Sequence, residues 1–182
     1  MNLSNKKVLD DESSTCYTTF MKKMMKTNAM RILDNANVNY EVHTYAHKEK
    51  EAVDGVHVAS MLNQDVQKVY KTLITQAPSK IYYVFVLPVN HELDFKKCAK
   101  VVHEKSVEMV PVKEITKVSG YVRGGCSPFG MKKPFVTVFY EACLQQKTIY
   151  FSGGKIGCQI EMDPQTAISL LHAQTADIIK TA

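Results

Sequence analysis

The longest apolar run of this sequence covers residues 81–89 (IYYVFVLPV) and has the length of a strand. A helix that crosses a membrane needs roughly 18 or more consecutive apolar residues, and no run in the chain approaches that length. We therefore expect residues 81–89 to form a central strand of a sheet, and we expect no membrane as a partner.

Signals for helices and strands alternate around this run. Capping residues predict three helices: Thr27 or Asn28 begins one that ends near Ala36, Asp94 one that ends near Val102, and Asp163-Pro164 one that ends near His172. Two more helices are predicted at residues 56–62 and 112–118, the second ended by Gly120. Strands are predicted at residues 40–45, 69–75, 81–89, 135–139, 148–152 and 158–162.

The spacing of these elements predicts the fold class. Short separations between the late strands suit antiparallel pairing, whereas helices interrupt the early strands. The chain has 182 residues, 45% hydrophobic and 23% charged, and a chain of this size buries about 70% of its unfolded surface around one core. We expect an α/β single domain with a mixed, mostly antiparallel sheet flanked by helices.

Charge leaves two interpretations open. The net charge is +5, and basic residues gather in the middle third of the chain: Lys96, Lys97, Lys100, Lys105, Lys113, Lys117, Arg123, Lys132 and Lys133. They predict either a surface that faces phosphates or an ordinary solvated surface.

The cysteine count and the first residues indicate the cellular compartment in which the protein works. The five cysteines are odd in number and form no Cys-x-x-Cys pair, so neither a disulfide framework nor a zinc knuckle is indicated, and a reducing cytoplasm fits best. Asp10, Asp11 and Glu12 precede any apolar stretch, which argues against a signal or transit peptide. Residues 1–25 are expected to be a flexible extension.

Three segments far apart in the chain share one chemistry. Residues 69–73 (VYKTL) place Lys71 in an apolar strand, residues 120–128 form a glycine-rich loop, and residues 152–155 (SGGK) end a strand with more glycines. A charged lysine in a strand is costly unless a phosphate, a carboxylate or a reacting group pairs with it. Together the segments predict a site for an anionic or ester-bearing ligand.

Three other motifs could indicate a different chemistry. Residues 152–157 lack the spacing of a phosphate-binding Walker loop, and no Ser or Thr follows Lys155 to hold magnesium. His43 and His47 are four residues apart at the end of a strand pattern and need not share a face, so we expect no metal. Cys126 follows two glycines, but no base is identifiable beside it.

The pair Gly124-Gly125 and the residue Tyr45 each allow a structural and a functional interpretation. The pair Gly124-Gly125 either makes a turn at positive φ or brings backbone amides to an oxygen that develops negative charge. With Lys71 in the chain, and with Ser127-Pro128 next to the pair, the second interpretation leads. Tyr45 is either a core residue or the lining of a wet edge that holds a ligand.

The ordered set of these segments resembles the YbaK family of trans-editing aminoacyl-tRNA deacylases, relatives of the editing domain of bacterial prolyl-tRNA synthetases. The resemblance runs from about Lys26 to Ile179. It rests on residues 26–29, 40–45, 69–73, 92–97, 107–109, 120–121, 124–125, 127–128, 132–133, 152–155, 159–161 and 176–178.

The resemblance implies a barrel-like sheet of the editing-domain type over residues 26–182, no cofactor, and tRNA as a partner through its aminoacylated 3′ end. It implies hydrolysis of the ester of a mischarged tRNA, Cys-tRNA(Pro) in the usual case, with the substrate thiol attacking the ester. An activated ester mainly needs orientation and oxyanion stabilisation. Prolyl-tRNA synthetase is a candidate second partner, which would supply the identity of the tRNA.

By position, the resemblance implies catalytic roles for Lys71 and Gly124. It implies substrate binding by Tyr45, Gly125, Ser127, Ser152 and Gly153. Two positions depart from the family pattern: Ile156 stands where an arginine is usual, and Tyr140, followed by Glu141, stands where an acidic residue is expected. An Ala-tRNA(Pro) editing domain, or an inactive module that binds a tRNA end or a protein, therefore remains an alternative.

Overall fold

The computed structural model describes residues 25–181. All but the last residue of the expected extension 1–25 lies outside the described residues. Among the described residues, the helices are too short or too polar to span a bilayer.

The helices begin and end where local signals predict. Thr27 caps α2 (Asn28–Asn35), and its side chain accepts a hydrogen bond from the Met30 N–H. Asp94 caps α4 (Phe95–Val101), and Asp163 caps α6 (Pro164–Leu171), which has proline in its first turn. The other helices are α3 (Gly55–Met61), α5 (Val112–Ser119) and the 3₁₀-helix η1 (Glu141–Gln145). Gly120 ends α5 with a φ of 85°, the left-handed conformation that favours glycine.

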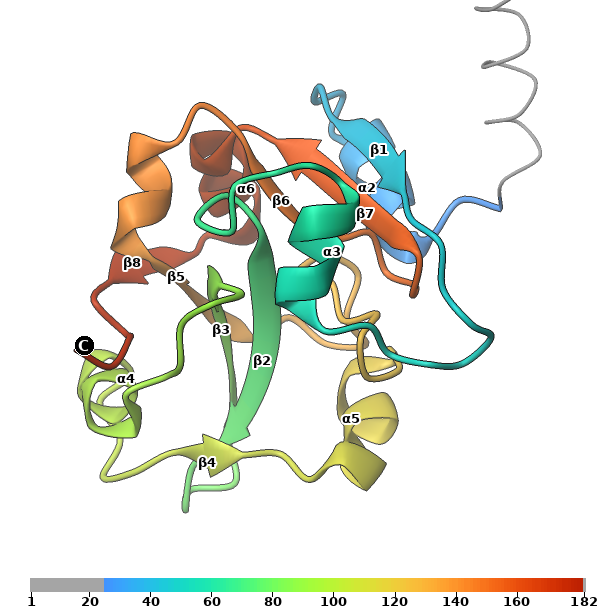
Figure 1. Cartoon of the computed structure of the whole chain (residues 1–182). Helices are drawn as coiled ribbons and strands as arrows, with labels where there is room; N and C mark the ends of the chain where they lie inside the picture. Colours follow the sequence, from blue (N-terminus) through green and yellow to red (C-terminus); the bar gives the residue numbers. More distant parts are fainter. Residues whose placement is uncertain (1–24, 182) are drawn as a thin grey trace, which may run out of the picture.

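The strands form two sheets (Figure 1). The three-stranded sheet is antiparallel and has the order β1 (Glu41–Thr44), β7 (Cys158–Met162), β6 (Ile149–Ser152). The five-stranded sheet has the order β4 (Glu108–Met109), β2 (Tyr70–Gln76), β3 (Tyr82–Pro88), β5 (Val136–Tyr140), β8 (Gln174–Ala176). In it, β2 is antiparallel to β3 and β4, whereas β5 is parallel to β3 and β8. The pairing is therefore mixed and mostly antiparallel, as expected.

One part of the pairing expectation is wrong. The strand predicted at residues 135–139 does not pair with the two strands that follow it, because β5 lies parallel to β3 in the other sheet. The helix η1, with Cys143 buried, lies between β5 and β6, and the chain passes from one sheet to the other there. The expected antiparallel pairing holds for β6 and β7.

The main core lies between the two sheets. It contains Val84, Val86 and Phe139 from the five-stranded sheet and Phe151 and Ile160 from the three-stranded sheet. A second cluster, which includes Phe85 and Leu87, packs against α4 on the other side of β3. Because β3 is buried on both faces and paired on both edges, the expectation of a central strand at residues 81–89 is confirmed.

The two sheets touch at one edge of β2 and do not close into a barrel. Val69 forms a parallel bridge with Tyr150, and the Tyr150 N–H donates to the Lys68 carbonyl at 2.8 Å. At its other end the same strand pairs with β4 through Thr75 and Gln76. Among the described strands, none pairs with this edge of β2 between these two contacts. The unpaired stretch of the edge is where the candidate site lies.

Candidate functional site

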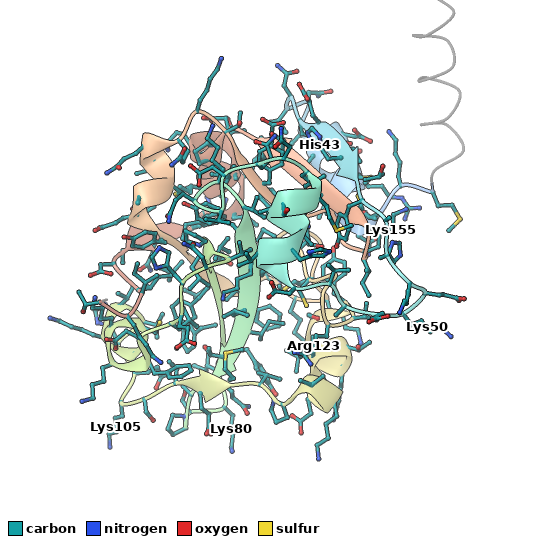
Figure 2. All side chains as sticks on the ribbon, in the orientation of Figure 1. His43, Lys50, Lys80, Lys105, Arg123 and Lys155 are labelled. Carbon is teal, nitrogen blue, oxygen red and sulfur yellow. The ribbon has the colours of Figure 1, made fainter. Side chains whose placement is uncertain are left out.

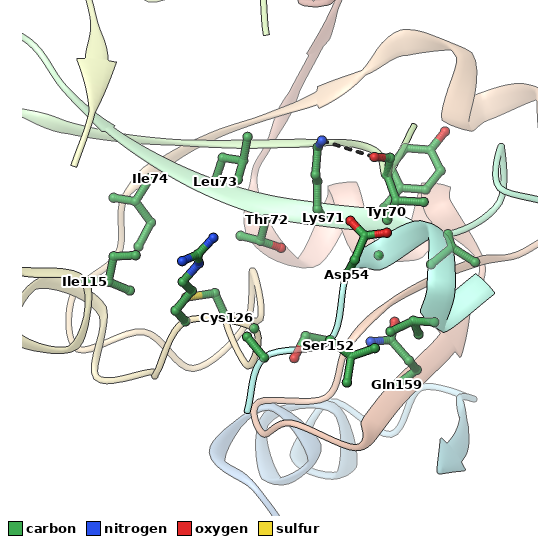
Figure 3. Close-up of a pocket in the computed structure, with 18 of the residues that line it drawn as sticks. Asp54, Tyr70, Lys71, Thr72, Leu73, Ile74, Ile115, Cys126, Ser152 and Gln159 are labelled. Atoms are coloured by element: carbon green, nitrogen blue, oxygen red, sulfur yellow. Dashed lines mark hydrogen bonds between the residues drawn. The ribbon is translucent and has the colours of Figure 1, made fainter. Parts of the chain in front are cut away.

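A cavity of about 540 Å³ opens along the unpaired edge of β2 (Figure 3). Its walls come from β2, the segment that leads into α3, the segment from β4 into α5, the glycine-rich loop, and the ends of β6 and β7. The lining residues are Tyr45, Ala52, Val53, Asp54, Gly55, Val58, Val69, Tyr70, Lys71, Thr72, Leu73, Ile74, Val89, Met109, Val110, Val112, Ile115, Arg123, Gly124, Cys126, Ser152 and Gln159.

The Lys71 ammonium is half-buried at this cavity. It donates one hydrogen bond to the Val89 carbonyl at 3.1 Å, drawn as the dashed line in Figure 3. Burial lowers the pKa of Lys71, and the carboxylates of Glu92 and Asp54 act against this shift. An ammonium has three donors. Val89 takes one, so donors remain for a ligand.

Two buried polar atoms on the cavity wall have no partner. The Thr72 hydroxyl and the side-chain amide oxygen of Gln159 make no hydrogen bond within the described part of the chain, although the two residues are only 9% and 6% exposed. Buried polar groups in native proteins are nearly always satisfied by protein, water or ligand. Both residues line the cavity, so these atoms lie at its wall without a partner of their own.

Ser152 and Tyr45 both line the cavity, and each is held in place by a hydrogen bond. Ser152 is paired with Gln159 across β6 and β7, and its hydroxyl accepts a hydrogen bond from the Gly154 N–H at 3.2 Å. Tyr45 is 8% exposed, and its N–H donates to the Gly157 carbonyl at 3.1 Å. We call Lys71, Thr72, Gly124, Ser152 and Gln159 the polar end of the cavity. Lys71 and Thr72 are neighbours on β2 and leave it on opposite faces, and Figure 3 shows Ser152 and Gln159 across the strand from the Lys71 ammonium.

The glycine-rich loop lies against the segment of residues 152–155. Gly124 lines the cavity with a φ of 82°, and a Cβ there would lie 2.8 Å from the Ala52 Cβ. A Cβ on Gly125 would lie 3.1 Å from the Lys155 Cα. Three segments far apart in sequence, around Lys71, Gly124 and Ser152, therefore meet at one cavity.

The remaining predicted site residues lie behind this wall. Gly125, Ser127 and Gly153 are buried and do not line the cavity. The Ser127 hydroxyl accepts from the Phe129 N–H at 3.3 Å, and the Gly153 carbonyl accepts from the Thr27 hydroxyl at 2.5 Å. These contacts hold the two loops in place.

Sequence reasoning missed Thr72 and Gln159. A signal for Gln159 was present, because it is a polar residue inside the otherwise mostly apolar strand Cys158–Met162. The signal for Thr72 was weaker, since threonine is common in strands.

The cavity wall contains a cysteine that is not activated. Burial raises the pKa of Cys126 to about 11, and its thiol donates to the Val122 carbonyl at 3.6 Å. A thiol with this pKa is almost entirely protonated at neutral pH and is a poor nucleophile. The described lining includes no histidine and no glutamate to act as its base.

A group of potential metal ligands lies outside the cavity lining. Glu41, His43 and Glu161 bring their ligand atoms within 4.8 Å of one another on β1 and β7. The Glu161 carboxylate contacts His43 at 2.8 Å and accepts a hydrogen bond from Thr148 at 2.6 Å, so its oxygens already have partners. His47 is not in the group.

The basic side chains labelled in Figure 2 lie in two places on the described part of the chain. Figure 2 shows Arg123, Lys155 and Lys50 on one side of the molecule, and Lys80 and Lys105 on another. Lys97, in the predicted basic stretch, pairs instead with Asp177 at 2.7 Å. Arg123 lines the cavity and lies within 4.0 Å of no described carboxylate.

Comparisons with known proteins identify the family of the chain. The family model described as "Aminoacyl-tRNA editing domain" matches residues 49–170, which contain every residue of the polar end. A relative from Enterococcus faecalis, named "Putative Cys-tRNA(Pro)/Cys-tRNA(Cys) deacylase EbsC", is 41% identical over 157 residues, which cover 86% of this chain and 95% of the relative.

Solved structures share the fold at low identity. The crystal structure of "a putative trans-editing enzyme for prolyl tRNA synthetase" is 18% identical, with a TM-score of 0.73 over 87% of this chain and 100% of that one. A hypothetical protein of solved structure is 19% identical, with a TM-score of 0.77 over 85% of this chain and 100% of that one. The chain belongs to the family of aminoacyl-tRNA editing domains and is an aminoacyl-tRNA deacylase.

Proposed function

We propose that this deacylase edits Cys-tRNA(Pro) in trans and that the substrate's own thiol cleaves the ester. The observation that carries the proposal is a cavity with polar groups free for a ligand but without an activated nucleophile of its own. Cys126 is the only lining thiol among the described residues, and burial raises its pKa to about 11. The name of the relative from Enterococcus faecalis supports the same substrate.

The described carboxylate of the lining is also a weak candidate for a base. Asp54 caps α3, where its side chain accepts hydrogen bonds from the Val56 and His57 N–H groups at 3.1 and 3.3 Å. Both bonds go to the same carboxylate oxygen, so this oxygen already has partners at the start of the helix. A substrate that brings its own nucleophile removes the need for one in the protein.

The proposed step is an intramolecular acyl transfer. The cysteinyl sulfur, as thiolate, forms a bond to its own carbonyl carbon, and the bond from that carbon to the ribose oxygen breaks. The thiol has released its proton to solvent, and the ribose oxygen takes a proton from solvent and leaves as the tRNA hydroxyl. Water then opens the resulting thiolactone to free cysteine, so the net reaction is hydrolysis of the ester.

The polar end has a group for each demand of this step. The Lys71 ammonium would favour the thiolate form of the substrate by charge. The Gly124 N–H, which has no hydrogen-bond partner among the described residues, would donate to the oxyanion. Gln159 and Thr72 would hold the α-ammonium, and Tyr45 and Ser152 would line the pocket, with Gly125, Ser127 and Gly153 supporting it.

The proposal also covers the extent of the editing unit, its compartment and its partner. We propose that residues 26–182 form the editing unit, that it acts in the cytoplasm where tRNA is charged, and that prolyl-tRNA synthetase supplies tRNA identity as a partner. The test is a deacylation panel of cysteinyl-, alanyl-, seryl- and prolyl-tRNA(Pro) and Cys-tRNA(Cys), with and without the synthetase. We expect cysteinyl substrates to be cleaved fastest. Faster cleavage of Ala-tRNA(Pro) would overturn the assignment.

A further inference from the structure

The start of α2 contacts one of the loops that build the site. Thr27, which caps this helix, lies before residues 49–170, the part of the chain that the family model matches. We propose that Thr27 is a positioning residue of the deacylase, whose hydroxyl holds residues 152–155 in the geometry that the reaction needs. The inference rests on the proposed roles of Ser152 and Gly124.

The Thr27 hydroxyl makes two hydrogen bonds at once. It accepts from the Met30 N–H at 3.2 Å, which caps α2, and it donates to the Gly153 carbonyl at 2.5 Å. A hydroxyl has one donor and two acceptor sites, so the two bonds do not compete. The second bond joins residues 126 positions apart in the chain and takes no part in capping the helix.

The helix that carries Thr27 is a firm support. Its residues Ala29, Met30 and Leu33 are buried in the main core, together with Phe151 and Ile160 from the three-stranded sheet. Figure 1 shows α2 beside the sheet that contains β1 and β7. A group on a packed helix fixes its partner more accurately than a group on a loop does.

The restraint passes from Gly153 to the Ser152 hydroxyl. The Gly153 N–H donates to the Cys158 carbonyl at 2.9 Å, so both main-chain polar groups of Gly153 have partners. The next residue, Gly154, donates its N–H to the Ser152 hydroxyl at 3.2 Å. This bond uses an acceptor site of Ser152 and leaves its O–H free to donate to a ligand in the cavity. The direction of that donor therefore depends on where Gly153 and Gly154 lie.

Close packing carries the same restraint to the glycine-rich loop. Gly154 has a φ of 97°, and a Cβ there would lie 3.2 Å from the Thr27 Cβ. Gly125 lies on the backbone of Lys155, where a Cβ would be 3.1 Å from the Lys155 Cα. Without the bond from Thr27, residues 152–155 are free to move away from α2, and the support behind Gly125 moves with them.

Two substitutions separate the donor from the cap. Thr27→Ser retains both hydrogen bonds. Thr27→Asp retains the cap of α2, because aspartate is a favoured capping residue, but it has no proton to donate to the Gly153 carbonyl. We expect Thr27→Ser to keep kcat within about twofold of wild type and Thr27→Asp to lower kcat at least about tenfold, with a smaller change in KM, because displaced positioning groups slow the chemical step.

Asp163→Ala is the matched control for the loss of a cap. Asp163 caps α6 by accepting a hydrogen bond from the Thr166 N–H at 2.7 Å, and it does not line the cavity. This variant should unfold at a lower temperature and keep its kcat, so it distinguishes a general loss of stability from a loss of positioning.

Hydrogen exchange of the Gly153 N–H measures the loop without a substrate. In Thr27→Asp this amide should exchange at least about tenfold faster than in wild type or Thr27→Ser, because local opening of the loop becomes easier. The amides of the central strand β3 should exchange as in wild type.

The rates are measured on the member of the tRNA panel that the wild type cleaves fastest, so the substrate assignment does not decide the test. A folded Thr27→Asp protein with wild-type kcat or unchanged Gly153 exchange would overturn the inference and leave the proposed function standing. Thr27→Ser as slow as Thr27→Asp would do the same, since it would show that the hydroxyl is not the group that matters. Fastest cleavage of Ala-tRNA(Pro) would overturn the proposed function and leave the comparison of the Thr27 variants valid.

Discussion

Lys71 and Val89 are joined by a hydrogen bond of 3.1 Å from the ammonium to the backbone carbonyl. The bond holds a half-buried cation beside a cavity instead of letting it extend into water. It supplies one partner for the charge, while the rest of the ammonium remains open to a ligand.

Replacing Lys71 by Ala should lower kcat/KM on Cys-tRNA(Pro) at least about tenfold, the effect of one lost charge-assisted contact. The fold should stay intact, because burial already disfavours the charged form. Lys68→Ala is the matched control, since Lys68 precedes the same strand and does not line the cavity. Full turnover in a folded Lys71→Ala protein would show that the site is misplaced.

Gly124→Ala should lower both stability and turnover. The residue has a φ of 82°, and the added methyl would lie 2.8 Å from the Ala52 Cβ. The double variant Gly124→Ala with Ala52→Gly relieves this clash, so thermal unfolding should recover in part while turnover stays low. If the double variant regains full turnover per folded molecule, Gly124 serves the turn and not the substrate.

Thr72→Val should stabilise the free protein and impair the enzyme. The Thr72 hydroxyl is buried without a partner, and such a group costs about 1–3 kcal/mol. Its removal should raise the free energy of unfolding by up to this amount, whereas kcat/KM should fall because the substrate loses a contact.

Thr75→Val is the matched control on the same strand. Thr75 is fully buried, but its hydroxyl donates to the Tyr83 carbonyl at 3.4 Å, and it does not line the cavity. This variant should lose stability and keep turnover. A Thr72→Val protein that is less stable and equally active would contradict the role given to the hydroxyl.

Cys126→Ala should leave kcat/KM within about twofold of wild type, a difference of less than about 0.5 kcal/mol in the barrier. The thiol has a pKa of about 11 and is therefore protonated at neutral pH. Single-turnover hydrolysis of Cys-tRNA(Pro) checks this expectation. A folded but inactive variant would point to a nucleophile carried by the protein.

Local signals were sufficient for most of the elements but not for their assembly. Thr27, Asp94 and Asp163 predict where helices begin, because a capping side chain accepts hydrogen bonds from N–H groups in the first turn of its own helix. The strands β4 and β8 have two and three residues, too few for a period to appear, and only their neighbours define them. The parallel pairing of β5 with β3 likewise depends on how the chain passes from one sheet to the other through η1. No local sequence pattern specifies that connection.

The same distinction applies to the site. Lys71, Gly124 and Ser152 were predicted because a charge in a strand and glycines in loops are visible in the sequence, and the structure brings them to one cavity. Thr72 and Gln159 become notable only when burial is known, because a polar atom without a partner is a property of the packed molecule. The partner of the Lys71 ammonium is the main-chain carbonyl of Val89. Every residue has such a carbonyl, so the sequence alone could not single this one out.

The rate on Cys-tRNA(Pro) against the rate on Ser-tRNA(Pro) tests the account most directly. The two aminoacyl groups are nearly equal in size, but the seryl hydroxyl has almost no anion at neutral pH, whereas the cysteinyl thiol has some. We predict that the seryl substrate is cleaved more slowly by orders of magnitude, and that cleavage of the cysteinyl substrate accelerates as pH rises toward the thiol pKa, about 8.5. Comparable rates on the two substrates would contradict cleavage by the substrate thiol.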